Sequence, residues 1–314
     1  MKVLIIGASG FIGLPVARAL SRAGHIVYGL TRSESKAKAL AAEEIIPIVG
    51  EPSNPEKWVS LVSTLDVVIE AVAGADLKTQ SSGIFQAVVH AAQTIRPSHA
   101  PKLAYIYTSG TWVHGDDRET IVTDTTPITK PVELVAWRPA LEQEIVTSTV
   151  VNGIVIRPSM LYGYSGSILS MMFQRAYKGK VSWFGTPGGR LAFVHADDLA
   201  DLYLRAAEKA QLVRGQIFDG TNDFTESADE LLEKLVQVSG AQGPYEYVQA
   251  SNLFETAITA TALIRPYLGR ALLGWQPRKA GVIDNLEVYY KAWKATDSSS
   301  SPPRTRSGTG AYKL

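Results

Sequence analysis

The chain contains no cysteine among its 314 residues. This absence excludes disulfide bonds, thiolate metal sites and cysteine nucleophiles. A histidine-based metal site is also not indicated, because no two histidines have the short spacing that such sites use. The histidines are His25, His90, His99, His114 and His195. We therefore expect no metal site.

The chain also lacks an excess of charge and a long apolar run. Lys plus Arg number 31 and Asp plus Glu number 30, which gives a formal net charge of +1. Such a balance creates no field that would attract nucleic acid or an anionic membrane. No run reaches the roughly 18 apolar residues that a membrane-spanning helix requires. We predict a soluble, cytoplasmic protein that binds small molecules, with a homodimer left open.

What the sequence does contain is a regular alternation of short β-branched runs and longer segments of helical period. The expected strands cover residues 3–6, 26–30, 45–49, 67–69, 103–107 and 154–156, and the expected helices cover 11–23, 34–42, 54–63, 79–96 and 133–148. This order is typical of βαβ units. The sequence therefore predicts an α/β fold with a Rossmann-type doubly wound parallel sheet.

The alternation becomes irregular after residue 160, where glycine and proline are frequent. We expect a dinucleotide-binding Rossmann core over residues 1–160. A small C-terminal substrate lobe should follow over residues 161–295, interleaved with the last elements of the sheet. The polar end, residues 296–314, should be a flexible tail because it cannot bury enough apolar area to fold.

A glycine-rich turn follows the first expected strand and precedes the first helix. Gly7 lets the chain turn sharply, Gly10 lets the backbone approach a pyrophosphate, and Gly13 lets the helix pack close to the sheet. The start of the helix directs free N–H groups at the phosphates. The turn predicts a dinucleotide site. Its expected binding residues are Gly7, Ser9, Gly10, Phe11, Ile12 and Gly13.

The end of the second expected strand indicates which dinucleotide is bound. An acidic residue there would bind the ribose 2′-hydroxyl of NAD, and an arginine would bind the 2′-phosphate of NADP. This chain has Thr31, Arg32 and Ser33. Arg32 can make a charge-assisted fork to the phosphate, and the two hydroxyls can add donors. We therefore predict NADP in preference to NAD.

Four further segments, together with the glycine spacing, resemble the extended branch of the short-chain dehydrogenase/reductase superfamily, the NAD-dependent epimerase/dehydratase-like proteins. They are residues 66–74 (DVVIEAVAG), 105–115 (YIYTSGTWVHG), 157–163 (RPSMLYG) and 193–200 (FVHADDLA). The resemblance runs from residue 1 to about residue 220. It implies further cofactor contacts at Ala71, Val72, Ala73, Thr108, Pro158, Ser159 and Met160.

The chain departs from this family at the catalytic residues. Family members generally pair a Ser or Thr with a Tyr-x-x-x-Lys, whose lysine lowers the tyrosine pKa for proton exchange. Here no tyrosine lies between Tyr107 and Tyr162, and Gly110 occupies the serine position. The remaining candidates for contact with substrate or for proton transfer are Ser109, Thr111, His114 and Tyr162, with Tyr164 as a further tyrosine near the sixth strand.

The helix expected at 133–148 carries Arg138 and Glu142, four residues apart, where the family has its tyrosine and lysine. An intrahelical ion pair is the simplest interpretation. The alternative is that Arg138 binds an anionic group of the substrate.

An apolar and aromatic set is expected around the substrate, comprising Trp112, Trp137, Tyr162, Tyr164, Met171, Met172, Phe173, Trp183 and Phe184. Such a wall suits a small carbonyl compound better than a sugar nucleotide, whose diphosphate needs basic partners. Arg175 and Arg190 keep the sugar nucleotide as an alternative.

The sequence thus predicts an NADP-dependent oxidoreductase that transfers hydride to or from a small, largely apolar carbonyl or alkene. Two alternatives stay open: a redox-neutral epimerase or dehydratase with bound NAD(P), and a catalytically silent NADP-sensing protein.

Overall fold

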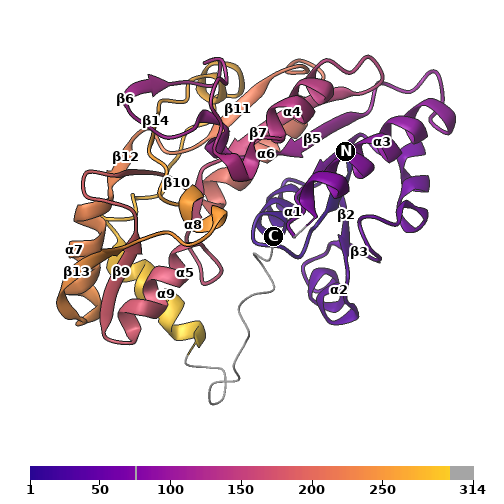
Figure 1. Ribbon diagram of the computed structural model, residues 1–314. Helices are drawn as coiled ribbons and strands as arrows, with labels where there is room; N and C mark the ends of the chain where they lie inside the picture. Colours follow the sequence, from indigo (N-terminus) through magenta and orange to yellow (C-terminus); the bar gives the residue numbers. More distant parts are fainter. Residues whose placement is uncertain (75, 298–314) are drawn as a thin grey trace.

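The computed structural model describes residues 1–74 and 76–297, and its centre is a seven-stranded parallel sheet (Figure 1). The strand order is β11-β7-β5-β4-β1-β2-β3. The strands are β1 (Lys2–Ile6), β2 (Ile26–Thr31), β3 (Ile46–Val49), β4 (Val67–Glu70), β5 (Ala104–Thr108), β7 (Asn152–Pro158) and β11 (Ile217–Gly220). The order reverses beside β1, which confirms the predicted doubly wound sheet.

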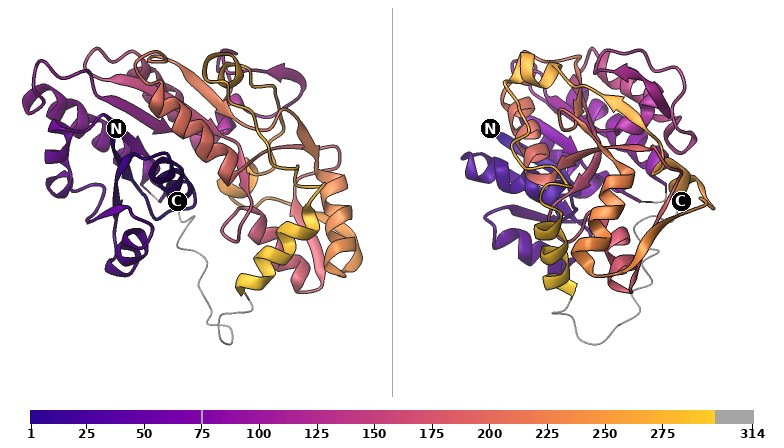
Figure 2. Two further views of the ribbon diagram at one scale, coloured as in Figure 1. Left: turned by 180° about the vertical axis from the view of Figure 1, so that it is seen from behind. Right: turned by 90° about the vertical axis from the view of Figure 1, so that its left-hand side faces the viewer.

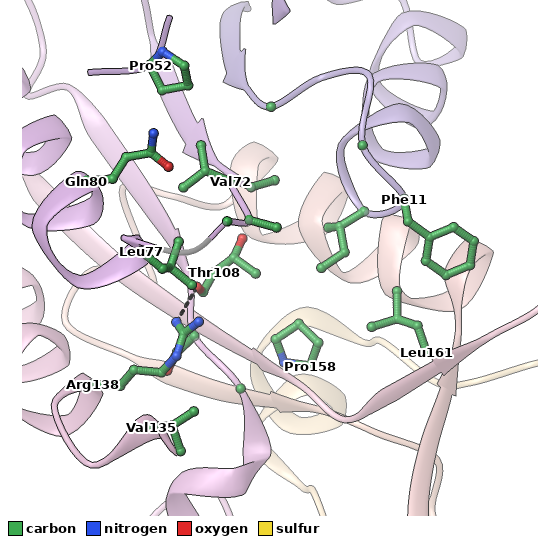
Figure 3. Close-up of a pocket in the computed structure, with 18 of the residues that line it drawn as sticks. Phe11, Pro52, Val72, Leu77, Gln80, Thr108, Val135, Arg138, Pro158 and Leu161 are labelled. Carbon is green, nitrogen blue, oxygen red and sulfur yellow. Dashed lines mark hydrogen bonds between the residues drawn. The ribbon is translucent and has the colours of Figure 1, made fainter. Parts of the chain in front are cut away.

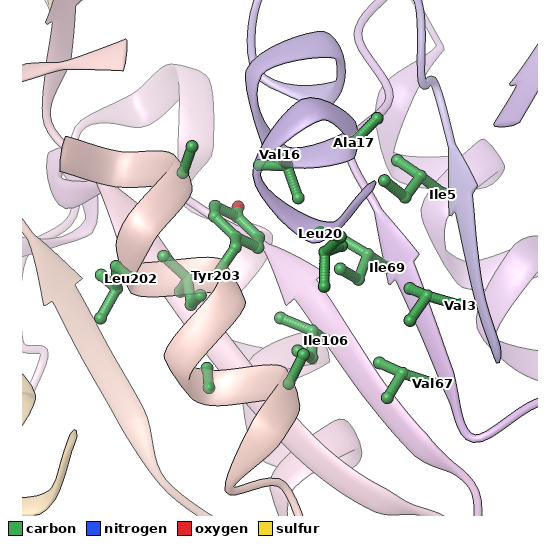
Figure 4. Close-up of a cluster of buried hydrophobic side chains, with 14 of the residues drawn as sticks. Val3, Ile5, Val16, Ala17, Leu20, Val67, Ile69, Ile106, Leu202 and Tyr203 are labelled. Atoms are coloured by element: carbon green, nitrogen blue, oxygen red, sulfur yellow. The ribbon is translucent and has the colours of Figure 1, made fainter. Parts of the chain in front are cut away.

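Helices cover both faces of this sheet, because successive side chains of a buried parallel strand point to opposite sides. On one face, Val3 and Ile5 of β1 pack against α1 (Gly13–Arg22) and α6 (Ala196–Glu208), which lie side by side (Figure 4). On the other face, Leu4 and Ile6 belong to a core that includes α3 (Leu77–Thr94) and α4 (Arg138–Val146). The short α2 (Glu34–Ala41) packs beside β2 and β3.

The remaining elements lie on the side of the molecule away from α2 and β3 (Figures 1 and 2). Most of them pack around a separate hydrophobic core, and β6 and β14 pack with β10 in a smaller one. The strands are β6 (Asp117–Val122), β8 (Met160–Tyr162), β9 (Lys180–Phe184), β10 (Arg190–His195), β12 (Thr225–Ser227), β13 (Gln242–Val248) and β14 (Ala262–Ile264). The helices are α5 (Leu169–Tyr177), α7 (Ala228–Ser239), α8 (Leu253–Ala257) and α9 (Leu286–Asp297). Since β11 is a strand of the large sheet and α6 packs on that sheet, the smaller part of the molecule is interleaved with the larger one in sequence.

Two predicted helices differ from the structure. Residues 54–63 form two short 3₁₀ helices, Pro55–Lys57 and Val59–Ser63, because the buried Trp58 between them leaves the helical region at a φ of −134°. The helix expected from residue 133 begins only at Arg138, because Pro139 lacks an N–H and fits the first turn of a helix but not its interior. A 3₁₀ turn, Glu133–Val135, precedes it.

The sequence prediction also missed strand β11, Ile217–Gly220, because two of its four residues are aspartate and glycine, which are rare in strands. The tail expected over residues 296–314 lies outside the described residues, apart from the end of α9. Across residues 1–74 and 76–297, no helix combines the length and the apolar character needed to cross a bilayer.

Two glycines predict opposite effects of the same substitution. Gly83 is exposed within α3, and a Cβ there would meet nothing within 4 Å, so Gly83→Ala should raise the free energy of unfolding by about 0.5–1 kcal/mol. A Cβ at Gly153 in β7 would lie 1.9 Å from the Ile145 carbonyl oxygen. Gly153→Ala should therefore destabilise by about 1–3 kcal/mol or more. Urea denaturation measures both, and equal effects would contradict this packing.

Candidate functional site

A cavity of about 810 Å³ lies where β1, β2, β4, β5 and β7 end, at the point where the strand order reverses (Figure 3). Open α/β sheets bind ligands in such a crevice. The predicted residues that line it are Gly7, Ser9, Gly10, Phe11, Ile12, Thr31, Arg32, Ser33, Ala71, Val72, Ala73, Thr108, Ser109, Thr111, Pro158, Ser159 and Met160. Three predicted site residues, Gly13, His114 and Tyr162, are not among the described lining residues.

The glycine turn forms the middle of the cavity. Gly7 has a φ of +95°, and a Cβ there would lie 2.4 Å from the Ala71 carbonyl oxygen. Gly13 is a packing residue, since its Cβ would lie 2.2 Å from the Gly7 carbonyl oxygen.

The N-cap of α1, Ile12, supplies no side-chain hydrogen bond to the helix start. The Leu14 N–H donates to the Gly10 carbonyl oxygen, but the N–H groups of Phe11 and Ile12, just before α1, have no backbone partner among the described residues. These N–H groups and the absence of a side chain at Gly10 fit a pyrophosphate.

The end of the cavity beside β2 is cationic. Arg32 is exposed and lines it, together with Lys36 from the first turn of α2. The sequence interpretation missed Lys36, which its position four residues after Arg32 could have indicated. The two predicted hydroxyls have protein partners: Thr31 Oγ1 lies 2.9 Å from Ser9 Oγ, and Ser33 Oγ accepts a hydrogen bond from the Lys36 N–H.

At the other end, the loop after β5 brings two candidate residues to the cavity. Ser109 is 7% exposed, its backbone N–H donates to the Ile156 carbonyl oxygen, and its Oγ has no hydrogen-bond partner among the described residues. Thr111 begins the 3₁₀ turn Thr111–His114 and also lines the cavity. A buried hydroxyl without a partner costs free energy unless a ligand satisfies it.

His114 and Tyr162 do not face the cavity, so the structure does not place them as proton donors there. The Nε2 atom of His114 lies 2.8 Å from Oδ2 of Asp219, and both side chains are buried. The fully buried Tyr162 donates from its hydroxyl to the Ala280 carbonyl oxygen. Both satisfy buried polar groups of the fold. Tyr164 is half exposed, and its hydroxyl donates to Asp197.

The predicted Arg138–Glu142 ion pair is wrong. Glu142 accepts hydrogen bonds from Nε and Nη2 of Arg157 on β7, at 3.0 and 2.6 Å. Arg138 instead donates from Nη1 to the Tyr107 hydroxyl at 2.7 Å and to the Thr108 carbonyl oxygen at 3.0 Å. The spacing rule for such pairs applies to exposed helix faces, whereas this face of α4 is buried on the sheet.

A buried polar group that the sequence interpretation missed lies beside Arg138. Glu70 at the end of β4 accepts hydrogen bonds from the Ser81 and Tyr105 hydroxyls, and its backbone carbonyl accepts one from Thr108. Burial raises the pKa of the Glu70 carboxyl from 4.5 to about 7, against the opposing effect of these donors and Arg138. The sequence could have indicated this group, because Glu70 is an acidic residue directly after the strand expected at residues 67–69.

The apolar end of the cavity is smaller than predicted. Trp112, Trp137 and Met160 line it, together with Leu134, Ile168 and Phe254. The Trp112 and Phe254 rings meet edge to face, with centroids 6.2 Å apart. The other expected wall residues, Met171, Met172, Phe173, Trp183 and Phe184, belong to or pack against the core around α5, α7 and α9.

The two arginines that would favour a sugar nucleotide are not among the described lining residues. Arg175 lies over the Phe184 ring, 4.5 Å from its centroid, and donates to Ser182. Arg190 donates to the hydroxyl and the carbonyl oxygen of Thr225. Both are therefore engaged outside the cavity, and the apolar end of the cavity has no cation from them.

Glu70 predicts a pH dependence of stability. Its folded pKa of about 7 lies above its unfolded value of 4.5, so the neutral carboxyl stabilises the fold at low pH and this stability is lost as pH rises from about 4.5 to 7. The loss should be roughly 3 kcal/mol. In Glu70→Gln, which cannot ionise, this slope should disappear. Urea denaturation at pH values from about 5 to about 8 measures the free energy of unfolding of both proteins. If it depends on pH in the same way in wild type and in Glu70→Gln, the role given to Glu70 is wrong.

The sequence matches the NAD dependent epimerase/dehydratase family over residues 3–219. The uncharacterized protein YLL056C of Saccharomyces cerevisiae is 26% identical over 306 residues, 92% of this chain and 99% of that protein. The decarboxylating sterol-4-alpha-carboxylate 3-dehydrogenase of Dictyostelium discoideum is 22% identical over 224 residues, 66% of this chain and 68% of that protein.

A solved structure has a similar fold. The dTDP-glucose 4,6-dehydratase of Bacillus anthracis, in complex with NAD, superposes with a TM-score of 0.77 at 16% identity, covering 95% of this chain and 98% of that chain. The family match, the similar fold and the glycine turn confirm the resemblance to the extended short-chain dehydrogenase/reductases. The chain therefore belongs to the NAD-dependent epimerase/dehydratase family.

Proposed function

We propose that the protein is an NADP(H)-dependent oxidoreductase that transfers hydride to or from a small, largely apolar carbonyl or alkene. The observation that carries this proposal is the continuity of one cavity. It extends from Arg32 and Lys36, past the uncapped start of α1, to the unpartnered hydroxyl of Ser109.

The charges of the cavity support NADP in preference to NAD. Among the described lining residues, four side chains are cationic, Arg32, Lys36, Lys78 and Arg138, and one, Asp76, is anionic. The position that would bind a ribose 2′-hydroxyl is at the end of β2. Thr31 occupies it, and no carboxylate does. Arg32 and Lys36 would hold the 2′-phosphate, and the first turn of α1 would hold the pyrophosphate.

The chain's residues would bind and orient the substrate. When bound, the dinucleotide supplies or accepts a hydride. Ser109 would donate a hydrogen bond to a substrate oxygen, with Thr111 beside it on the same loop. Trp112 and Phe254 would enclose the apolar part of the substrate and exclude water. Without the tyrosine of the family, hydride transfer would depend on binding and orientation, and turnover should be slow.

A redox-neutral reaction on a sugar nucleotide is less well supported. The Bacillus anthracis relative acts, by its name, on dTDP-glucose. A diphosphate needs basic partners, and Arg175 and Arg190 are engaged elsewhere.

The oxidoreductase proposal is tested by adding NADPH to the purified protein with benzaldehyde, acetophenone or cyclohexenone and following NADPH absorbance. Oxidation that requires the carbonyl or alkene supports it. Tight NADPH binding without turnover of any compound would indicate the NADP-sensing alternative.

Removing Arg32 should change the choice of cofactor. Arg32→Ala should weaken NADP⁺ binding by roughly 10- to 100-fold and change NAD⁺ binding little, because only NADP⁺ carries the 2′-phosphate. Calorimetric titration with each dinucleotide measures this. Lys38→Ala is the matched control, since Lys38 is an exposed cation of α2 that does not line the cavity. Equal losses for both dinucleotides would contradict the proposal.

A side chain at Gly10 should prevent the binding of either dinucleotide. The Cβ at this position would lie 3.2 Å from the Gly7 carbonyl oxygen and 4.0 Å from that of Ala71, inside the expected pyrophosphate site. Gly10→Val should therefore reduce NADP⁺ and NAD⁺ binding alike, with an unchanged circular dichroism spectrum. Gly83→Ala, outside the cavity, is the control and should bind normally. Normal binding by Gly10→Val would place the pyrophosphate elsewhere.

A further inference from the structure

Arg138 is a buried cation at the wall of the cavity. Arg138 is the first residue of α4, is 9% exposed and lines the cavity (Figure 3). Ser109 lines the same cavity. Within the described part of the chain, no carboxylate lies within 4.0 Å of its guanidinium. A buried charge without a partner is strongly unfavourable, so such charges are normally paired or bind a ligand.

The neighbouring groups compensate only part of this charge. Arg138 lies 4.8 Å from the ring centroid of Trp137 and 5.7 Å from that of Tyr107, distances at which aromatic faces attract a cation. The nearby carboxyl, Glu70, is held by Ser81 and Tyr105 instead. Its raised pKa also leaves it partly protonated near neutral pH. Arg138 therefore still lacks a full negative charge.

The geometry of Arg138 leaves one edge of the guanidinium available. Both hydrogen bonds in the described chain leave from Nη1, to the Tyr107 hydroxyl and the Thr108 carbonyl oxygen. These bonds fix the plane of the guanidinium. The donors on Nε and Nη2 are not among the sealed, unpartnered atoms of the interior. This edge has the spacing that binds the two oxygens of a carboxylate.

A second, independent feature adjoins Arg138. Thr108, whose carbonyl oxygen accepts the hydrogen bond from Nη1, precedes Ser109, which lines the same cavity. The Ser109 Oγ atom is itself sealed from solvent and has no partner among the described residues. A serine hydroxyl can donate one hydrogen bond to an anionic oxygen. Arg138 therefore offers accessible charged donors, and Ser109, which follows the carbonyl that holds Arg138, offers a hydroxyl that a ligand would reach by rotation of the serine side chain.

The phosphates of a dinucleotide are not the anion that Arg138 lacks. Arg32 follows β2, whereas Arg138 is bonded to the end of β5, and β1 and β4 lie between these strands. Three strand spacings correspond to roughly 14 Å. The pyrophosphate would lie at the start of α1, beside β1, two spacings or roughly 10 Å away. The missing negative charge must therefore come from another molecule.

We propose that Arg138 and Ser109 form an oxyanion site that binds a carboxylate of the substrate, so that the substrate is a small organic acid with an apolar body. This proposal rests on the proposed oxidoreductase function, because it assigns the substrate end of the same cavity. The carboxylate pairs with the Nε–Nη2 edge of Arg138 and accepts a hydrogen bond from the Ser109 hydroxyl. Trp112 and Phe254 contact the apolar body.

The test compares benzoate with benzamide, which has a similar shape and no charge. Each is titrated calorimetrically into the protein saturated with NADP⁺. Wild type should bind benzoate at least about tenfold more tightly than benzamide, since a paired charge in a buried site contributes more than a neutral hydrogen bond. Equal affinity for the two, or no benzoate binding, would overturn the proposal.

Variants of Arg138 and Ser109 distinguish a specific loss of carboxylate binding from a general loss of structure. Arg138→Met should abolish the preference for benzoate, Arg138→Lys should retain part of it, and Ser109→Ala should weaken the binding of benzoate more than the binding of NADP⁺. If Arg138→Met weakens NADP⁺ binding as much as benzoate binding, Arg138 serves the cofactor and the proposal is wrong. Oxidation of NADPH by a neutral carbonyl, without any carboxylate preference, would support the oxidoreductase function and reject the oxyanion site.

Discussion

The backbone at the end of β1 is packed so closely that no side chain fits there. A Cβ on Gly13 would lie 2.2 Å from the Gly7 carbonyl oxygen, and a Cβ on Gly7 would lie 2.4 Å from that of Ala71. This contact brings the start of α1 against the ends of β1 and β4, where the strand order reverses. The crevice and the position of the start of α1 at its base depend on it.

Two sets of buried polar residues near this crevice differ in whether they line the cavity. Below it, Arg157 pairs with Glu142 and lies 3.8 Å from Asp219, which His114 also contacts. Opposite charges meet there, so these residues join α4, β7 and β11 into one unit. Arg138 and Ser109, by contrast, line the cavity, whereas none of these four residues is among its described lining residues. This difference separates the supporting residues from those that are available to a ligand.

The sequence predicted most of the fold because its signals are local. The glycine turn and the buried strands depend on neighbouring residues alone, and the cavity includes nearly all of the cofactor contacts that were expected. The errors arise where distant residues decide. Glu142 pairs with Arg157, fifteen positions along the chain, and Tyr162 donates to Ala280. A spacing rule written for exposed helices cannot show either contact.

We infer that one cavity would hold NADP with its phosphates at the β2 side and would leave the β5 side for the substrate. A crystal structure of the complex with NADP⁺ tests it most directly. The account predicts the 2′-phosphate within hydrogen-bond distance of Arg32 and Lys36, the pyrophosphate at the first turn of α1, and the nicotinamide beside Ser109. A dinucleotide bound in the opposite direction, or a 2′-phosphate away from both cations, would contradict it.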